Sequence, residues 1–376
     1  MADMSEHNDG VPCLMMRGGT SKGLYFLGDD LPQDVAARDA LLLSVMGSPD
    51  PRQIDGMGGA HPLTSKVAVV GPPTVDGADI DYLFLQVVVD EATVTDKQNC
   101  GNILAGVGPF AVERGLVAVG PDDEMATVRL HMVNTGGIAT ETFPVRDGRP
   151  EYSGSTAIAG VPGTAAEVRI DFADTAGSSC GALFPTGNVV DEVCGVAVTL
   201  VDNGMPVVVL RADDMGITGE ESPSELEAND ELRRRLEEIR LAAGPLMNLG
   251  DVTSLTIPKL TMVSAPRDGG SIGTRTFIPH RCHDAIGVLG AVSVATAALV
   301  PGTPAAEVLG PVTDGTAAAG TVVVEHPTGT FDAAVDVTIA TDASASGSTV
   351  TVGRSGIIRT ARKLMDGRVF PHEELS

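Results

Sequence analysis

Hydrophobic residues along this chain fall mostly into short runs that end at or beside turn-forming residues. Runs such as KVAVVG, TVRLHMVNT and GVAVTLVDNG are rich in β-branched residues, alternate in part with polar positions, and are bounded by Gly, Pro, Asn or Asp. β-Strands that are bounded by turns have this pattern. Because the pattern recurs along the whole chain, we predict a fold that is rich in short strands.

Helical patterns are fewer, and two of them have recognisable ends. We predict one helix over 34–49, where the pattern ends in Gly-Ser-Pro, and another over 222–244. In the second, Ser222 is a suitable N-cap, and Glu225 completes a capping box with it. Leu232, Leu236 and Ile239 share one face and charged residues fill the rest, which indicates a helix on the surface.

Two other stretches are apolar on every side of a possible helix. One is AIGVLGAVSVATAALV, residues 285–300, and the other runs from Ile103 to Val112. A helix that is hydrophobic all round must be enclosed on all sides. The longer stretch has 16 residues, fewer than the ~20 that span a bilayer. We therefore predict two buried helices, each surrounded by strands.

Both predicted buried helices follow a polar turn that contains a cysteine, which indicates an internal repeat. The two cysteines, Cys100 and Cys282, lie 182 positions apart, close to half of the 376 residues. We predict an α+β fold of two similar domains, 1–179 and 180–376, each with a central helix that is wrapped by strands. Two such domains side by side would place the starts of both helices at a shared cleft.

Composition narrows the classes of function. The formal net charge is −25, which argues against a nucleic acid or an anionic membrane as partner, because both need a basic surface. An anionic substrate would need local cations to capture it. The five cysteines are odd in number and widely spaced, and the N-terminus is polar and acidic, so we expect no disulfide framework, no signal peptide and a cytoplasmic location.

The segment KQNCGNILAGVG carries the first candidate for chemistry, Cys100. The start of a helix has unpaired N–H groups and a partial positive charge, which stabilise a thiolate. The N–H groups of Gly101 and Asn102 could bind a carboxylate in the same place. The alternative is a structural cysteine that is only buried.

Three further segments carry candidate cations. Lys66 begins an apolar strand after a Gly/Pro-rich turn, and it could transfer protons if it is desolvated, although a solvated lysine is the alternative. The turn MRGGTSKG, with Arg17 and Lys22, suits an anion, but it is not a Walker loop. The segment TRTFIPHRCH brings Arg275 and Arg281 to a possible positive rim, and it is too crowded to favour a metal site.

Several of these motifs together resemble one family. MRGGTSKGLYF, IDGMGGAHPLTSKVAVV, QNCGNILAGVGPFA, PTGN, NLGD and FIPHRCHDAIGVLGAVSVATA are similar to the PrpF family of isomerases over nearly the whole chain. The resemblance implies the diaminopimelate epimerase fold, two pseudo-symmetric domains that each wrap an antiparallel, barrel-like sheet around a central helix. It also implies an active site in the cleft between the domains, and a homodimer with no cofactor and no metal.

The resemblance also implies a reaction, a 1,3-allylic proton shift on a small tricarboxylate. The implied substrate is 4-oxalomesaconate, from the breakdown of gallate, protocatechuate and lignin-derived aromatics. Aconitate or 2-methylaconitate is the alternative substrate, and a non-catalytic anion-binding protein of the same fold is the alternative from another class. The shift needs proton-transfer groups and a pocket that stabilises an anion.

By motif, the resemblance assigns the proton transfers to Lys66 in LTSKV and to Cys100 in QNCGN. The epimerases proper use one cysteine from each domain, and Cys282 stands at the second position. In PrpF-like chains the lysine takes the partner's role, so Cys282 is left outside the pair. The residues expected to bind substrate are Arg17, Gly18, Ser21, Lys22, Gly101, Asn102, Asn188, Arg275 and Arg281.

Overall fold

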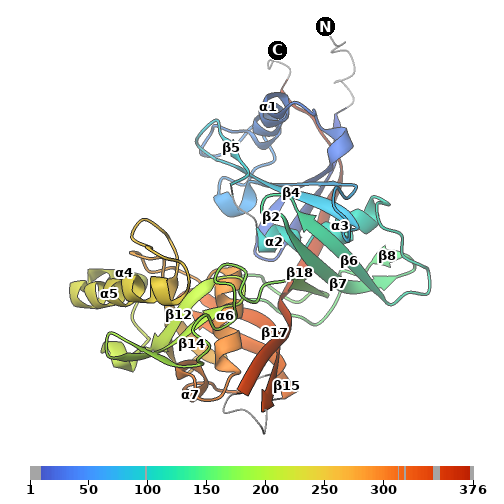
Figure 1. The fold of residues 1–376 in the computed structure, drawn as a ribbon. Helices are drawn as coiled ribbons and strands as arrows, with labels where there is room; N and C mark the ends of the chain where they lie inside the picture. Colours follow the sequence, from blue (N-terminus) through green and yellow to red (C-terminus); the bar gives the residue numbers. More distant parts are fainter. Residues whose placement is uncertain (1–9, 98–99, 312, 317–318, 342–347, 373–376) are drawn as a thin grey trace. The chain divides into compact units, whose positions relative to one another are not determined.

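The chain folds into two compact units that the last strand connects (Figure 1). The computed structural model describes residues 10–97, 100–311, 313–316, 319–341 and 348–372. Unit 1 contains the chain up to Ile170 and again from Arg359, and unit 2 contains Asp171–Ile358. This division differs from the predicted ranges, because the 22-residue strand β18 (Ser348–Val369) begins beside β17 and ends paired with β1.

Unit 1 is built on six strands that pair in chain order. The successive pairings are antiparallel, parallel, antiparallel, parallel and antiparallel. The strands are β1 (Val11–Gly18), β2 (Ser21–Leu27), β3 (Lys66–Gly71), β4 (Ile80–Val87), β6 (Met125–Met132) and β7 (Gly137–Arg146). The shorter β5 (Val94–Thr95) and β8 (Arg149–Pro150) pair with β4 and β7, and β9 is Glu167–Phe172.

Unit 2 repeats the same order of pairings. Its strands are β11 (Val196–Asp202), β12 (Pro206–Arg211), β13 (Lys259–Ser264), β14 (Ile272–Phe277), β16 (Ala319–His326) and β17 (Gly329–Thr341), with β10 (Asp191–Val193) and β15 (Thr313–Thr316) beside them. The α+β fold with two pseudo-symmetric units is therefore confirmed. The sheet is mixed rather than antiparallel throughout, because each unit has two parallel pairs, which need long crossovers.

The predicted central helices occupy the second crossover of each unit. In unit 2, α6 (Val288–Ala298) is buried from Gly290 to its end and contacts β11, β12, β16 and β17, so the interpretation of 285–300 is confirmed. In unit 1, the predicted single helix is two short ones, α2 (Gly101–Leu104) and α3 (Val107–Glu113). The physical reason is Pro109, whose ring would clash with the carbonyl of Ala105 in a continuous helix.

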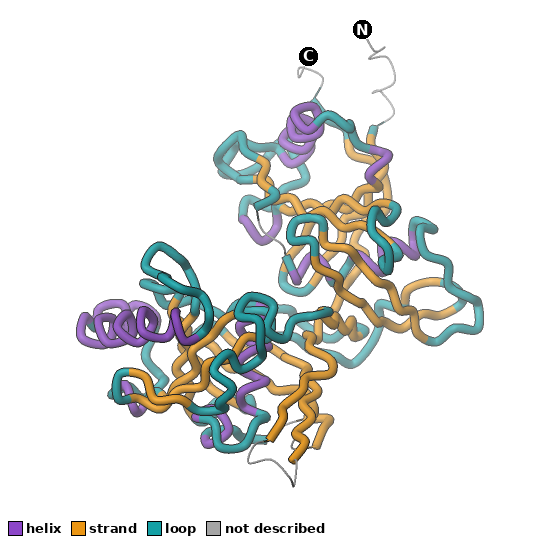
Figure 2. Tube along the Cα trace, in the orientation of Figure 1, coloured by secondary structure: helices purple, strands orange, loops and turns teal. Residues whose placement is uncertain are grey.

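The longer of the other helices lie in the first crossovers, among the many strands that Figure 2 shows in orange. In unit 1, α1 (Val35–Met46) begins at Asp34, which accepts a hydrogen bond from the N–H of Ala37, and it ends at Gly47 with φ of 77°. In unit 2, the predicted surface helix is divided at Asn229 into α4 (Pro223–Ala228) and α5 (Asp230–Leu246). The capping box of Ser222 is confirmed. A short helix, α7 (Pro304–Glu307), follows α6.

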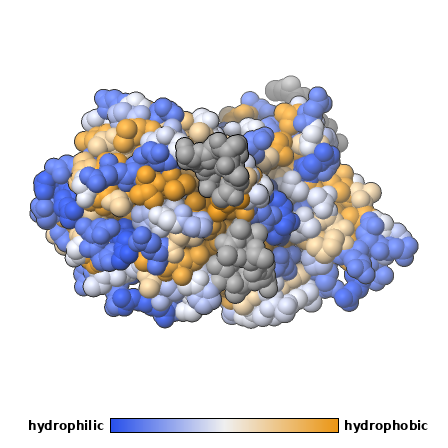
Figure 3. All heavy atoms as spheres, turned by 60° about the horizontal axis from the view of Figure 1, so that its bottom comes forward, coloured by the Kyte–Doolittle hydropathy of each residue, from blue (hydrophilic) through white to orange (hydrophobic). Residues whose placement is uncertain are grey.

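Large hydrophobic side chains are exposed at several described positions, among them Val35, Ile54 and Phe370. On the face shown in Figure 3, hydrophilic and hydrophobic residues are interspersed. Every helix within the described residues is too short or too polar to reach from one side of a bilayer to the other. The long apolar segments are instead inside the units, where α6 and α3 are almost completely buried.

Candidate active site

Cys100 is the residue from which α2 begins. Its backbone is extended, with φ of −133°, and its carbonyl accepts the first helical hydrogen bond from the N–H of Leu104 at 2.9 Å. The hydroxyl of Tyr82 donates to the same carbonyl at 3.4 Å. The half-buried thiol therefore stands at the start of a single helical turn, as predicted, whereas Asn99 before it lies outside the described residues.

The turn between β1 and β2 packs against this helix start. A Cβ at Gly18 would lie 2.3 Å from the backbone oxygen of Asn102, and one at Gly19, where φ is +50°, would lie 2.2 Å from the Oδ1 of Asn102. Only glycine allows such an approach. The side chain of Asn102 also donates to Thr20 at 3.1 Å and accepts from Arg359 at 3.1 Å. The side-chain amide of Asn102 therefore holds the turn between β1 and β2. The backbone N–H groups at the start of α2 are the donors that this site offers to a ligand.

Lys66, the first residue of β3, has an almost fully buried side chain with 6% of its surface exposed. Its ammonium donates to the Oε1 of Gln86 at 2.7 Å and lies over the ring of Phe84, 5.0 Å from its centroid. Gln86 is held by donating its amide N–H groups to the carbonyls of Ser65 and Pro62 at 2.9 and 3.1 Å. Within the described residues, no carboxylate pairs with this ammonium.

One face of β4 connects the two candidate residues. Tyr82, Phe84 and Gln86 alternate along this strand, so their side chains point to the same side. Tyr82 contacts Cys100, and the other two contact Lys66. Tyr82 and Gln86 are four positions apart, which is ~13 Å along a strand. The contacts with Cys100 and Lys66 are therefore no farther apart than this along β4.

Two phenols lie close to Cys100. Tyr25 donates to the carbonyl of Ile103 at 2.5 Å, one turn into the helix that Cys100 begins. Burial, and next the proximity of Cys100, raise the pKa of Tyr25 and of Tyr82 well above the usual range. Both therefore stay protonated and act as donors. Our sequence reasoning missed Tyr25, Tyr82, Phe84 and Gln86, although the alternation in YLFLQ marks the last three as one face.

Three of the expected substrate-binding residues line a separate cavity of about 690 Å³. They are Arg17, Ser21 and Lys22, and the rest of the lining consists of Thr20, Thr64 and residues of β18 and of the segment 152–165. All of its lining residues belong to unit 1. Neither Lys66 nor Cys100 lines it.

The three candidates of unit 2 make their contacts locally. The side-chain amide of Asn188 donates to Asp191 at 2.8 Å, and Arg275 donates to the carbonyls of Glu221 and Thr274 at 2.6 and 2.9 Å. Burial is the main cause that lowers the pKa of Arg275. Arg281 is 82% exposed and reaches Glu227 at 3.5 Å. Their role in binding substrate stays a prediction.

The segment that carries Cys282 was predicted to form a positive rim, but it contacts two glutamates. The N–H of Cys282 donates to Glu227 at 3.0 Å, and His280 lies 3.8 Å from Glu237. Burial raises the pKa of the Cys282 thiol to about 11, so this thiol is protonated at neutral pH. No three His, Cys, Asp or Glu side chains of the described residues are close enough together to hold a metal ion.

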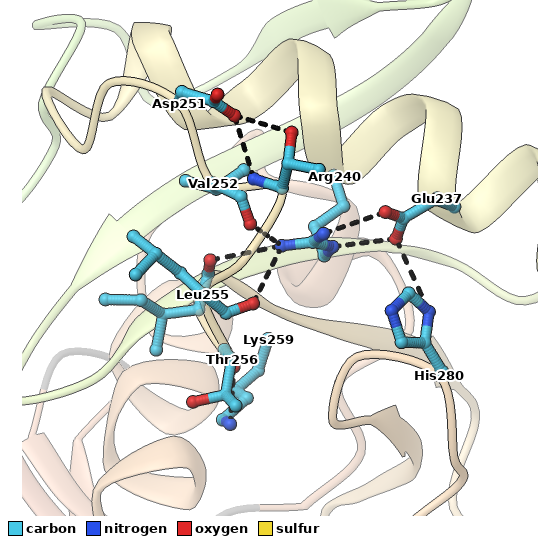
Figure 4. Close-up of polar contacts among 10 residues, drawn as sticks. Glu237, Arg240, Asp251, Val252, Leu255, Thr256, Lys259 and His280 are labelled. Carbon is cyan, nitrogen blue, oxygen red and sulfur yellow. Dashed lines mark hydrogen bonds and ion pairs between the residues drawn. The ribbon is translucent and has the colours of Figure 1, made fainter.

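His280 of this segment and the fully buried guanidinium of Arg240 both lie beside the carboxylate of Glu237 (Figure 4). It forms two hydrogen bonds with Glu237, at 2.7 and 2.8 Å, and donates to the carbonyls of Val252, Leu255 and Ile257 at 2.9 to 3.3 Å. These contacts fix the loop that leads into β13. Arg240 is thus part of the framework of unit 2 and not a free cation for a ligand.

Comparison with known proteins gives consistent matches over almost the full length. The family model described as PrpF protein matches residues 9–372. The (4E)-oxalomesaconate Delta-isomerase of Novosphingobium sp. (strain KA1) is 60% identical, and the match covers 96% of this chain and 98% of that protein. The 4-oxalomesaconate tautomerase of Pseudomonas putida is 55% identical, with 96% and 95% covered. The crystal structure of methylitaconate-delta-isomerase is 36% identical, with a TM-score of 0.81 and with 96% and 95% covered.

Proposed function

The chain belongs to the PrpF family, and on that premise we propose that this isomerase moves a proton between two carbons of 4-oxalomesaconate. Two relatives that are 60% and 55% identical are named for isomerisation or tautomerisation of this compound. The metabolic setting that follows from the proposed substrate is the breakdown of gallate, protocatechuate and lignin-derived aromatics. A cytoplasmic homodimer that acts without a cofactor belongs to the same proposal.

The chemistry requires one C–H bond to be broken and another to be formed. In a substrate whose keto group is conjugated with the double bond, the C–H bond at the γ carbon is acidic, because the electron pair that remains after its proton leaves spreads through the double bond into the keto group as a dienolate. A proton returned at the other end of the allylic unit completes the shift without any change of oxidation state. Such a reaction needs positioned acid and base groups and donors near the oxygen that gains charge.

We assign the two proton transfers to Cys100 and Lys66. The Cys100 thiolate takes the proton from one carbon, and the Lys66 ammonium gives a proton to the other. The observation that carries this proposal is the shared face of β4, on which Tyr82 contacts Cys100 while Phe84 and Gln86 contact Lys66. The backbone N–H groups of Gly101 and Asn102 are the proposed donors to a substrate carboxylate.

The environment of Lys66 supports its role. A buried ammonium is costly unless an opposite charge is near, and its partners among the described residues are a neutral amide and an aromatic ring. An anionic substrate would supply the missing charge, and a dienolate would place it next to the ammonium. A lysine with this surrounding is therefore better suited to an anionic intermediate than to an ion pair within the protein.

Proton NMR of the purified protein with 4-oxalomesaconate in D2O tests the proposal. We expect isomerisation with deuterium entering at two carbons, and we expect Lys66→Met and Cys100→Ser each to lose exchange at one of them. Lys97→Met and Cys194→Ser are matched controls at exposed positions, and both should behave as the unmodified protein. Unchanged turnover in either of the first two variants would contradict the assignment.

The choice of substrate in the same experiment separates the alternatives. Turnover of aconitate or 2-methylaconitate, without turnover of 4-oxalomesaconate, would change the substrate and leave the proton-transfer pair in place. Absence of turnover with all three compounds would favour a non-catalytic anion-binding protein. Direct titration with the same compounds would then show whether the protein binds them.

A further inference from the structure

Three cations of unit 1 stand side by side on three neighbouring strands. Arg17 of β1 is directly opposite Lys22 of β2 and directly opposite Arg362 of β18. Side chains at directly opposed positions have Cβ atoms only ~4.5–5.5 Å apart, and like charges in such positions are destabilising. A row of three cations therefore needs an anion to compensate it.

The protein itself supplies little compensation. Neither Lys22 nor Arg362 has an ion pair or a side-chain hydrogen bond to any described residue. Arg17 donates from one terminal nitrogen only, to the carbonyls of Gly19 and Thr360 at 2.8 and 3.0 Å and to the Thr360 hydroxyl at 3.0 Å. Burial first, and Arg362 second, lower the pKa of Arg17. In a chain with 50 acidic and 25 basic residues, this absence of a carboxylate partner is unexpected.

Arg17, Lys22 and Arg362 all line the cavity of about 690 Å³ in unit 1. None of the described residues that line this cavity is acidic. Ser21, which is 1% exposed, is also among the lining residues, but it shares the face of Gly18 and Gly23, so its hydroxyl is not counted with the cations. The other hydroxyl groups around the cavity belong to Thr20, Thr64, Tyr152, Ser153, Thr156, Thr164 and Thr360.

The cavity is distinct from the site at Lys66 and Cys100. Along β1 and β2, Gly18 and Gly23 approach Asn102 and Lys66, and thus face the central helix. Arg17 and Lys22 alternate with these glycines, so their side chains leave the strands on the other face. The lining of the cavity includes neither of the two proton-transfer residues.

We propose that Arg17, Lys22 and Arg362 form a binding site for a small polycarboxylate in this cavity. Three neighbouring strands span ~10 Å, which matches two or three carboxylates on one carbon chain better than a single small anion. The free N–H groups of the two arginines are suited to bidentate hydrogen bonds with carboxylates. The occupant is either the substrate of the isomerase or a second polycarboxylate that regulates it, and the recognition chemistry is the same.

Isothermal titration calorimetry with tricarballylate, a saturated tricarboxylate that cannot isomerise, tests the site without any need for turnover. We expect the unmodified protein to bind it more tightly at low salt, and acetate to bind far more weakly. Arg362→Gln removes one charged donor, so we expect affinity to fall about tenfold or more. Lys22→Gln should weaken binding in the same direction.

Arg368→Gln is the matched control, because it removes the same charge from the same strand outside the cavity. It should bind tricarballylate as the unmodified protein does. The proposal is overturned if the unmodified protein does not bind tricarballylate, if Arg362→Gln and Lys22→Gln bind it normally, or if the control loses as much affinity. Equal affinity for acetate would overturn the assignment to a polycarboxylate.

Two further arms identify the occupant and test the separation. Tricarballylate can also bind at Lys66 and Cys100, so Lys66→Met should lose only that binding event, and loss of the event that Arg362→Gln removes would contradict a distinct site. In an isomerisation assay, substrate as occupant would make the rate depend on two substrate-binding events, and Arg362→Gln should leave only the one at Lys66 and Cys100. A rate that responds to added tricarballylate only in the protein with Arg362, at unchanged KM for substrate, supports a regulator. If no isomerisation occurs at all, the titration still decides whether the site exists.

Discussion

The two units have the same order of strand pairings, but they differ where the central helix begins. In unit 1, Cys100 is the residue that starts the first turn. In unit 2, α6 starts at Gly287, and Cys282 lies five positions earlier, buried and hydrogen-bonded through its N–H to Glu227. The same framework therefore presents different residues at the start of its two central helices.

The lysines at the start of the third strand show the same contrast. Lys66 and Lys259 are both the first residue of a strand that runs parallel to its predecessor, β3 and β13. Lys66 contacts Phe84 and Gln86. Lys259 is half-buried and donates to the carbonyl of Thr256 at 2.6 Å, and burial, followed by the charge of Arg240, lowers its pKa. Equivalent positions in the fold thus hold lysines with different partners.

Substitution of the two lysines should have the largest effect and should differ most between the units. Positioned proton-transfer groups contribute ~10²–10⁴-fold to rate, so we expect Lys66→Met to reduce kcat by that order. Lys259→Met removes the same charge from the equivalent position of unit 2, and we expect kcat to stay within about twofold of the unmodified rate. Steady-state kinetics with 4-oxalomesaconate measure both. Equal losses would mean that the two lysines are functionally equivalent.

Removal of Arg240 should produce the next largest effect, on stability rather than on chemistry. Arg240→Met leaves Glu237 and the carbonyls of Val252 and Leu255 without their buried partner. Breaking a buried pair in this way costs ~3–5 kcal/mol. Urea unfolding monitored by circular dichroism would measure the loss. Arg234→Met, on the exposed side of α5, is the control and should cost less than ~1 kcal/mol.

Buried carboxyl groups provide a third difference between the units. In unit 2, Glu325 accepts three backbone N–H groups, from Arg267, Asp268 and Gly270, at 2.7 to 2.8 Å. In unit 1, Glu141 accepts only that of Gly108 at 2.7 Å, and its other oxygen has no partner among the described residues. Burial raises the pKa of Glu141 well above its usual value of 4.5.

The consequence is a pH dependence that Glu141→Gln should remove. Above pH 4.5 the unfolded chain has lost this proton, whereas the folded protein retains it up to its own higher pKa. The contribution of Glu141 to stability is therefore fully present below pH 4.5 and is lost as pH rises, by at most ~1.4 kcal/mol per pH unit. Unfolding free energies from pH 4.5 to 8 would measure the slope. The exposed Glu124→Gln should leave the slope unchanged.

The smallest effect is expected for Cys282. Because burial raises the pKa of its thiol to about 11, alkylation should be slow at pH 7 and should accelerate as pH approaches that value. Peptide mass spectrometry after timed treatment with iodoacetamide would follow Cys282 beside the exposed Cys194. Cys282→Ser should change kcat by less than about twofold. Labelling of Cys282 as fast as that of Cys194 at pH 7 would contradict this contrast between the thiols.

The fold was largely predictable because its signals are local. Strand alternation, the capping box of Ser222 and the apolar stretch 285–300 each depend on neighbours in sequence. The break before Pro109 was also signalled locally, and our prediction of one continuous helix overlooked it. The row of cations was not predictable in the same way, because Arg17 meets Arg362 across 345 positions of sequence. No local pattern specifies that register.

The last strand has a consequence for how the protein is made. Because β18 supplies the neighbour of β1, unit 1 is incomplete until the ribosome has produced the chain as far as Val369. Arg359, which holds Asn102, and Arg362, which lines the cavity, arrive only then. Domains usually fold in the order of synthesis. Here, however, β1 has no β18 to pair with until all of unit 2 has been translated. Release of a chain that ends before β18 would therefore leave an unpaired strand exposed to aggregation.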